Sequence, residues 1–215
     1  TMLESPSDPA AGRRALGLPQ APRLSFVGRL TRHKRVDRAL RILAQLENAR
    51  LDVIGDGPER ARLEALAETL GLGDRVAFHG LVSEARKWAL LGAAEAVLLL
   101  SEADAATGAY EGFGIAMLEG VAAGAAAVST AADGMADFVL EAGGGLQIPA
   151  GGDSAADADA AEAVARLLED APRRRALVEA GRRALRARYN WTAIAAQIAV
   201  ETAPESGAAL LHETG

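Results

Sequence analysis

Short apolar runs alternate with amphipathic segments along residues 24–148. The apolar runs bounded by Gly, Ser or Pro predict six strands, at 24–28, 51–55, 75–79, 96–100, 126–129 and 145–148. Apolar residues at helical spacing predict helices between them, at 36–47, 58–70, 83–91, 114–123 and 134–141. Alternating strands and helices indicate an α/β fold of three layers, with a mostly parallel six-stranded sheet covered on both faces.

The pattern changes beyond Pro149. A stretch rich in Gly, Asp and Ala at 150–160 leads into helical patterns at about 160–169, 173–188 and 191–202. No strand pattern follows. From Pro204 onward we expect the chain to fray.

Composition is that of an ordinary globular protein and excludes several kinds of site. Half of the residues are hydrophobic (50%) and 24% are charged, while cysteine is absent, which excludes disulfides, thiolate metal sites and a cysteine nucleophile. The three histidines, at 33, 79 and 212, do not have metal-ligand spacing. No apolar run reaches the roughly 18 residues of a membrane span, and no signal peptide pattern is present. We therefore expect no metal and a cytoplasmic location.

Charge is distributed unevenly along the chain. Residues 1–50 hold ten Lys and Arg and four acidic residues, so their net charge is +6. Because the whole chain has a net charge of −6, the remaining residues carry −12. This asymmetry favours a local site for a compact anion such as a diphosphate over the broad basic face of a nucleic-acid binder. Solvated helix charge is the alternative explanation for most of these arginines.

Two carboxylates flank a glycine-rich turn that opens an apolar helix. Glu111 and Glu119 are separated by seven residues, so a continuous helix would place them about 12 Å apart, too far to act on one glycosidic bond. They suit the two ends of one long ligand. Backbone N–H groups at the helix start offer an anion site between them, at Gly112, Phe113, Gly114 and Ile115. A nucleotide sugar is a ligand that would use these features together. The alternative is that Glu111 and Glu119 are ordinary surface acids without a ligand.

A basic loop follows the first predicted strand. Gly28 permits a tight turn, and Arg29 and Lys34 are placed to reach one phosphate group. Lys34 is the stronger candidate because the chain holds only two lysines, Lys34 and Lys87, among 23 basic residues, which suggests a demand for a compact charge. An exposed basic turn is the alternative.

The ends of the next two strands supply weaker candidates. Gly55 and Gly57 surround Asp56 in a turn that permits close approach to a ligand, although a plain turn from strand to helix explains them nearly as well. His79 would place an imidazole near a nucleotide. A packed or capping histidine is the more common arrangement, so we assign His79 a minor role.

Taken in order, these elements resemble the C-terminal half of retaining glycosyltransferases of family 4, which have the GT-B fold. The resemblance covers about residues 14–202. It rests on Gly28-Arg29-Leu30 with Lys34, Gly55-Asp56-Gly57-Pro58-Glu59, Val76-Ala77-Phe78-His79-Gly80, Glu111-Gly112-Phe113-Gly114 through Glu119 and Gly124, and Gly143-Gly144-Gly145-Leu146.

The resemblance implies a Rossmann-like nucleotide-sugar domain at 23–203, preceded by an interdomain linker at 1–22 and followed by a frayed tail at 204–215. Its donor would be a UDP- or GDP-linked hexose, transferred with retention and without a metal or other cofactor. The implied catalytic roles are neutralisation of the diphosphate by Arg29 and Lys34 and binding of the donor sugar by Glu111.

Further roles follow from the same resemblance. Glu119 would bind the ribose hydroxyls, and the N–H groups of Phe113 and Gly114 would face the sugar or phosphate. The remaining matched positions would contribute to the substrate site. The segment Tyr189-Asn190-Trp191 resembles the family's F-x-W, near a final helix that crosses back to the partner domain.

The chain also differs from the family's usual sequence. Arg35 stands where a glycine commonly follows the lysine, Gly120 where an alanine is common, and Ala126 where a proline is usual. The loop at 101–110 is longer than usual between the strand and the E-G-F-G turn.

In the family, a preceding domain binds the acceptor and contributes a histidine near the reacting sugar. We therefore expect the chain to be the donor-binding domain of a retaining hexosyltransferase, inactive without that half, which would be supplied in cis or in trans. Peripheral membrane contact would go through that half. A non-catalytic nucleotide-sugar-binding subunit and a GT-B-like sugar-nucleotide epimerase are the alternatives. The base, the hexose, the acceptor and the oligomeric state stay open.

Overall fold

All six strands lie parallel in one sheet, in the order β3-β2-β1-β4-β5-β6. The computed structural model describes residues 8–112, 114–130 and 137–188. The strands are β1 (Arg23–Val27), β2 (Arg50–Ile54), β3 (Val76–Gly80), β4 (Ala96–Leu99), β5 (Ala126–Ser129) and β6 (Gly145–Gln147). The predicted α/β fold is confirmed. The strand order reverses between β1 and β4, and ligands in such sheets bind at this point, outside the carboxyl ends of the strands.

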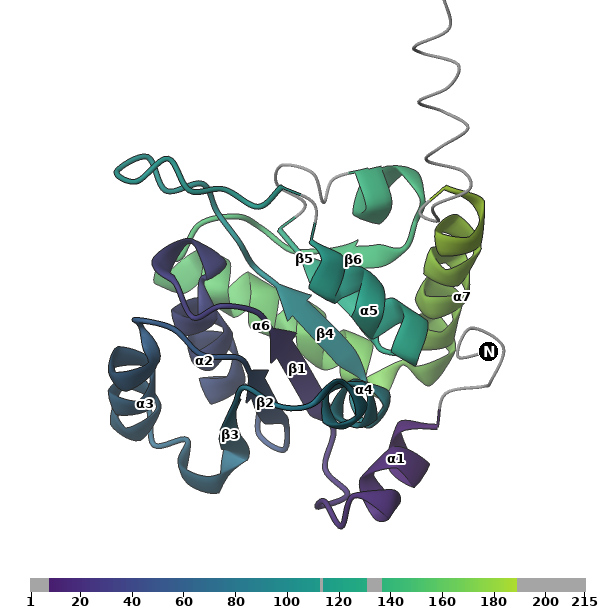
Figure 1. Ribbon diagram of the computed structural model, residues 1–215, viewed down its shortest axis with the longest axis horizontal. Coiled ribbons are helices and arrows are strands. Elements are labelled where there is room, and N and C mark those ends of the chain that lie inside the picture. Colours follow the sequence, from purple (N-terminus) through teal and green to yellow (C-terminus); the bar gives the residue numbers. More distant parts are fainter. Residues whose placement is uncertain (1–7, 113, 131–136, 189–215) are drawn as a thin grey trace, which may run out of the picture.

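Helices cover both faces of the sheet (Figure 1). They are α1 (Pro9–Ala15), α2 (Val36–Ala44), α3 (Arg60–Thr69), α4 (Glu84–Gly92), α5 (Ile115–Ala123), α6 (Ser154–Glu169) and α7 (Ala171–Ala187). Two short 3-10 helices, η1 (Arg32–Lys34) and η2 (Gly73–Arg75), and a π-helix, η4 (Asp137–Glu141), complete the described part. No helix in that part is long and apolar enough to cross a membrane.

The alternation of side chains along the strands builds a hydrophobic core on each face. On one face, Phe26, Val53 and Leu98 pack with residues of α2 and α6. On the other, Val97 and Leu99 pack with residues of α4, α5 and α7. Because both faces are buried, β4 consists of Ala, Val and Leu alone, as expected for a central strand of a parallel sheet.

The predicted strand positions agree with the structure to within one residue at each end. Two helices depart from the prediction, one in its start and one because no helix was predicted there. Helix α6 begins at Ser154 rather than near residue 160, because the Asp153 side chain accepts a hydrogen bond from Ala156 N at 2.8 Å and caps it. Within the predicted linker, α1 forms behind a similar Asp8 cap. The predicted helix at 191–202 and the Tyr189-Asn190-Trp191 segment lie outside the described residues, as does the first part of the predicted helix at 134–141.

Four arginines bind the carbonyl groups at the C-terminal ends of four helices. They are Arg13 at α4, Arg75 at α2, Arg174 at α6 and Arg182 at α5. The helices of a parallel α/β fold run opposite to its strands, so these ends gather at the edge where the strands begin. A cation there satisfies free carbonyls and complements the negative end of the helix. These arginines thus stabilise the fold at the edge opposite the predicted ligand site.

Most of the basic residues in the first 50 positions also have structural partners. Ion pairs join Arg13 to Glu95, Arg23 to Asp52, Arg38 and Arg41 to Asp157, and Arg50 to Asp74. Ion pairing within the fold, rather than simple solvation, therefore accounts for much of the positive charge of this segment. Arg29 and Arg32 are exposed and form no ion pair with any residue that the structure describes.

A buried ion pair on β2 predicts loss of stability in acid. Burial raises the pKa of Asp52, but hydrogen bonds from His79 and Arg23 lower it further, so the net pKa lies below its ordinary 3.8. A carboxyl whose pKa is depressed by folding stabilises the protein above the unfolded pKa, and this contribution is lost as pH falls below it. We expect the urea midpoint of the wild type to fall more between pH 6 and 3 than that of Asp52→Asn.

The exposed Asp159 of α6 supplies the control for this experiment. Asp159→Asn should keep the pH dependence of the wild type. If Asp52→Asn kept it as well, the depressed pKa of Asp52 would not contribute to acid unfolding.

Candidate ligand-binding site

The turns after β1 and β2 pack directly against each other. Leu30 N donates to Asp56 O at 3.0 Å, and a Cβ on Gly55 would lie 1.9 Å from Gly28 O. A Cβ on Gly57 would lie 2.4 Å from Leu30 O, so any larger residue would force the turns apart. Gly55 also has φ 135°, which L-residues rarely adopt. The contact between the turns therefore requires both glycines whether or not a ligand binds.

A cleft of about 520 Å³ opens at the ends of β1, β2 and β3, beside α4. We call it the glycine-lined cleft. Its wall combines apolar side chains, including the 85% exposed Leu81, with two cations. Three predicted glycines and Arg29 are brought together here, along with residues that the sequence analysis did not assign. Its main lining residues are Gly28, Arg29, Gly55, Gly57, Leu81 and Lys87.

Lys87 connects this cleft to the second predicted glutamate. Its Nζ lies 2.7 Å from Glu119 and 3.0 Å from Glu84. Burial lowers the pKa of Lys87, but the bonds to these carboxylates outweigh burial and raise it, so Lys87 stays charged. Lys87 was not predicted as a site residue from the sequence. Its rarity, as one of two lysines in the chain, was the signal that could have found it.

The first glutamate forms a separate cluster with the other lysine. Glu111 is 8% exposed and accepts hydrogen bonds from Lys34 Nζ, from Ser101 Oγ at 3.2 Å and from Gly114 N at 3.1 Å. Burial raises the pKa of Glu111, but the bond to Lys34 and the charge of that lysine lower it more, so the carboxylate stays ionised. Ser101 was not found from the sequence, where no motif contains it. The two glutamates thus belong to two lysine–glutamate pairs.

Helix α5 begins at Ile115, one residue later than predicted, and this changes which N–H groups can bind an anion. Gly114 N is occupied by the Glu111 carboxylate, and Gly112 is exposed. The helix begins at Ile115, so the N–H groups of Ile115 and Ala116 have no acceptor within it. Phe113 lies outside the described residues. The positive end of the helix dipole is therefore offered by the first turn of α5.

His79 supports the sheet and does not line the glycine-lined cleft. Its Nε2 lies 2.8 Å from Asp52 Oδ1, and Arg23 binds the same carboxylate at 2.7 Å. Asp52 is fully buried, so it needs these partners to compensate for its lost hydration. The packed-histidine alternative accounts for this arrangement, and the minor nucleotide contact of His79 stays a prediction.

The two predicted phosphate ligands face different ways. Arg29 is exposed and lines the glycine-lined cleft, whereas Lys34, at the end of η1, turns to Glu111. Both belong to the segment that joins β1 to α2.

A protein-family model described as glycosyl transferases group 1 matches residues 12–184 of the chain. The chain is 32% identical over 179 residues to the lipopolysaccharide core biosynthesis glycosyltransferase LpsD of Rhizobium meliloti, covering 81% of the chain and 48% of the relative. It is 35% identical over 200 residues to the D-inositol 3-phosphate glycosyltransferase of Xylanimonas cellulosilytica, covering 89% and 45%. The chain thus spans about half the length of these curated relatives.

Solved structures show the same fold. Sucrose-phosphate synthase from Thermosynechococcus elongatus has a TM-score of 0.76 and 29% identity, covering 93% of the chain and 49% of that protein. HepE of Anabaena, in complex with UDP and glucose, has a TM-score of 0.76 and 24% identity, covering 92% and 52%. The second likeness bears on the fold alone.

Proposed function

Since the chain belongs to the glycosyl transferases group 1 family, whose neighbours share the GT-B fold, we propose that it is the donor-binding half of a retaining hexosyltransferase. Its donor is a nucleoside diphosphate sugar, UDP- or GDP-linked, and no metal takes part. The observation that carries this proposal is the placement of the two lysine–glutamate pairs. Lys34–Glu111 and Lys87–Glu119 lie at the carboxyl edge of the sheet, with the glycine-lined cleft beside the second pair.

In this proposal, three positive groups at the carboxyl edge of the sheet bind the diphosphate. Arg29 has no ion pair among the described residues, Lys34 presents an ammonium at the end of η1, and the first turn of α5 presents N–H groups that have no acceptor within the helix. Such donors are already oriented in the folded protein, so they stabilise charge on the leaving diphosphate without reorganisation. This arrangement supports a step in which cationic side chains, rather than a metal, neutralise the leaving group.

The nucleoside end of the donor fits the glycine-lined cleft. Leu81 and Val82 supply an apolar surface for a base, and the glycines let the backbone approach the ligand closely. Glu119 accepts hydrogen bonds from the ribose hydroxyls in this proposal, and Lys87 balances its charge. Glu111 takes the same role for the donor sugar. The preceding domain, in cis or in trans, supplies the main acceptor site and a histidine near the reacting sugar.

The two glutamates provide the test of this proposal. Glu119→Gln should weaken binding of UDP or GDP and of the matching sugar conjugate alike, by about 1 kcal/mol or more, because the ribose is common to both. Glu111→Gln should weaken only the conjugate. Bare diphosphate should bind this variant as well or better, because Lys34 loses its competing carboxylate. Calorimetry with UDP, UDP-glucose, GDP and GDP-mannose measures all four affinities.

Glu162→Gln, an exposed change on α6, is the control and should leave every affinity unchanged. An equal loss of bare diphosphate binding in both glutamate variants would contradict the two roles. Absence of binding of all four nucleotides by the wild type would contradict the proposed function itself.

A further inference from the structure

A second cleft, of about 630 Å³, lies beside the β1–α2 turn and shares no lining residue with the glycine-lined cleft. We call it the charged cleft. Its walls come from the turn after β1, the start of α3 and the long loop that follows β4. Its charged lining residues include Arg32, Arg35, Asp37, Glu59, Arg62 and Glu102.

Two differences from the usual family sequence meet in this cleft. Arg35, where glycine is common, has φ 52°, and it is the only described non-glycine residue with a positive φ. This conformation costs free energy for an L-residue and persists only where other contacts hold it, here ion pairs to Glu102 and Asp37. The second difference is the long loop at 101–110, which supplies Glu102, Asp104 and Thr107 to the lining. Features particular to this chain therefore shape the cleft.

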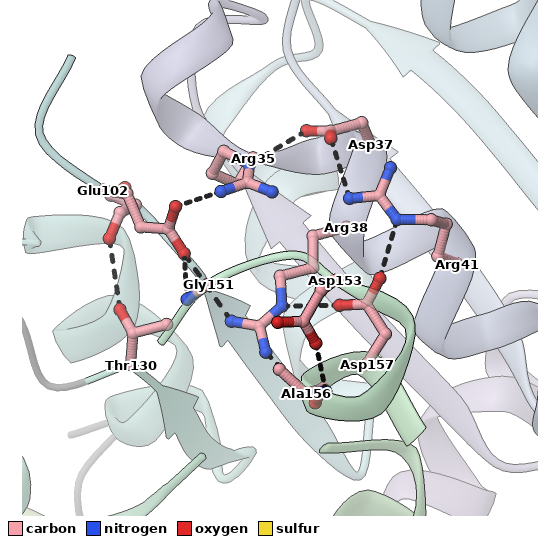
Figure 2. A network of polar contacts seen from close by, with 11 residues as sticks. Arg35, Asp37, Arg38, Arg41, Glu102, Thr130, Gly151, Asp153, Ala156 and Asp157 are labelled. Carbon is pink, nitrogen blue, oxygen red and sulfur yellow. Dashed lines mark hydrogen bonds and ion pairs between the residues drawn. The ribbon is translucent and has the colours of Figure 1, made fainter. Parts of the chain in front are cut away.

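Three lining residues, Arg35, Asp37 and Glu102, belong to a network of polar contacts (Figure 2). Glu102 lies between Arg35 and the backbone of the β6–α6 segment, where Gly151 N donates to it at 2.8 Å. Glu102 N also donates to His33 O at 2.9 Å. The lining is thus oriented before any ligand arrives, which reduces the entropic cost of binding.

The chemistry of the lining selects the class of ligand. Its carboxylates are largely balanced within the protein: Glu102 pairs with Arg35, and Glu59 pairs with Arg62 at 2.6 Å. Among the lining residues that the structure describes, the apolar side chains are Ala103 and Ala106, and these two small groups give no broad surface for a lipid tail or a flat base. Hydroxyl groups both donate and accept hydrogen bonds, and they match a lining that holds both carboxylates and guanidinium groups. A compact ligand with many hydroxyls fits this wall.

The cleft adjoins the Lys34–Glu111 pair. His33 and Arg35, on either side of Lys34, line it, and Glu102 follows Ser101, which binds Glu111. Burial and the nearby Lys34 lower the pKa of His33, so its imidazole is neutral near pH 7 and suited to a hydroxyl partner.

We propose that the charged cleft binds a sugar or cyclitol acceptor next to the donor sugar and so contributes to acceptor choice from this half of the enzyme. The inference rests on the proposed function, because an acceptor exists only for a transferase. Arg32, exposed and without an ion pair in the described part of the chain, and Arg62, at the rim, are the residues to test.

The experiment uses saturation-transfer NMR on the 215-residue chain, with and without UDP or GDP. The probes are myo-inositol and lactose, two neutral polyols. We expect a saturation-transfer signal from at least one polyol. The double variant Arg32→Ala/Arg62→Ala should reduce this signal threefold or more. The control Arg166→Ala, an exposed change on α6, should keep the full signal. Affinity for UDP and GDP should stay within twofold in both variants.

Each other outcome is decisive. The proposed acceptor site is overturned if neither polyol gives a saturation-transfer signal. It is also overturned if the double variant and the control give equal signals. A loss of nucleotide affinity in the double variant assigns the cleft to the donor and also overturns it. The affinity for UDP and GDP and the polyol signal are two separate measurements. Failure of the wild type to bind UDP or GDP therefore counts against the proposed function, whatever the polyol signal is.

Discussion

Asp157→Ala is expected to lower the free energy of unfolding by about 3 to 5 kcal/mol. Asp157 is 2% exposed and accepts hydrogen bonds from Arg38 Nε at 2.8 Å and Arg41 Nε at 2.7 Å, which joins α6 to α2 (Figure 2). Arg38 is fully buried, so the substitution leaves a guanidinium in the interior without its main partner. Removal of one member of a buried ion pair costs more than the pair contributes, because the remaining charge cannot recover its hydration. Urea unfolding at pH 7 measures the change.

The same substitution two positions further along α6 is the matched control. Asp159 is exposed, so Asp159→Ala changes helix propensity and net charge in the same way without opening a buried network. We expect its stability to stay within about 0.5 kcal/mol of the wild type. Equal midpoints for the two variants would show that the Arg38–Asp157–Arg41 network does not stabilise the fold.

Lys34→Ala is expected to weaken binding of UDP or GDP by about 1.5 to 3 kcal/mol, which corresponds to roughly 12- to 150-fold in affinity. Two effects act in the same direction. A charge-assisted hydrogen bond to the diphosphate is lost. In addition, the Glu111 carboxylate, 8% exposed, loses its cation and repels the incoming anion. Titration calorimetry of the folded variant gives the affinity, and a thermal melt confirms that it folds.

A double variant separates these two effects. Glu111→Gln added to Lys34→Ala removes the repelling carboxylate, so part of the lost affinity should return. A conservative Lys34→Arg should retain much of the binding because it keeps the charge. Wild-type affinity in Lys34→Ala would remove Lys34 from the diphosphate site.

The fold could be predicted from the sequence because its determinants are local. Short apolar runs bounded by Gly, Ser or Pro marked the strands to within one residue, and their alternation with segments of helical period implied parallel pairing. The early start of α6 was missed because Asp153 stands in a stretch of Gly, Asp and Ala that resembles a loop. Helix α1 was missed because its stability depends on packing, including the buried Arg13–Glu95 pair at 2.6 Å.

The site could be predicted only in part. Lys34, Glu111 and Glu119 were selected from their types and spacing, and the structure places them at the carboxyl edge of the sheet. Lys87 and Ser101 were not selected, because their roles come from contacts across 32 residues, to Glu119, and across the long loop, to Glu111. His79 was assigned to the ligand because a strand end says nothing about the buried Asp52 on the neighbouring strand.

By itself, the sequence determined the α/β class, the parallel sheet and the edge at which ligand chemistry gathers, since these follow from local periodicity and from the geometry of alternating strands and helices. Only the tertiary structure decided which charges meet. It paired Lys34 with Glu111 and Lys87 with Glu119 and Glu84, used four arginines to bind helix ends and brought Arg35 against the long loop at 101–110. The physical reason is that a charge acts through its burial and nearest partners, and both are set by segments far apart in the chain.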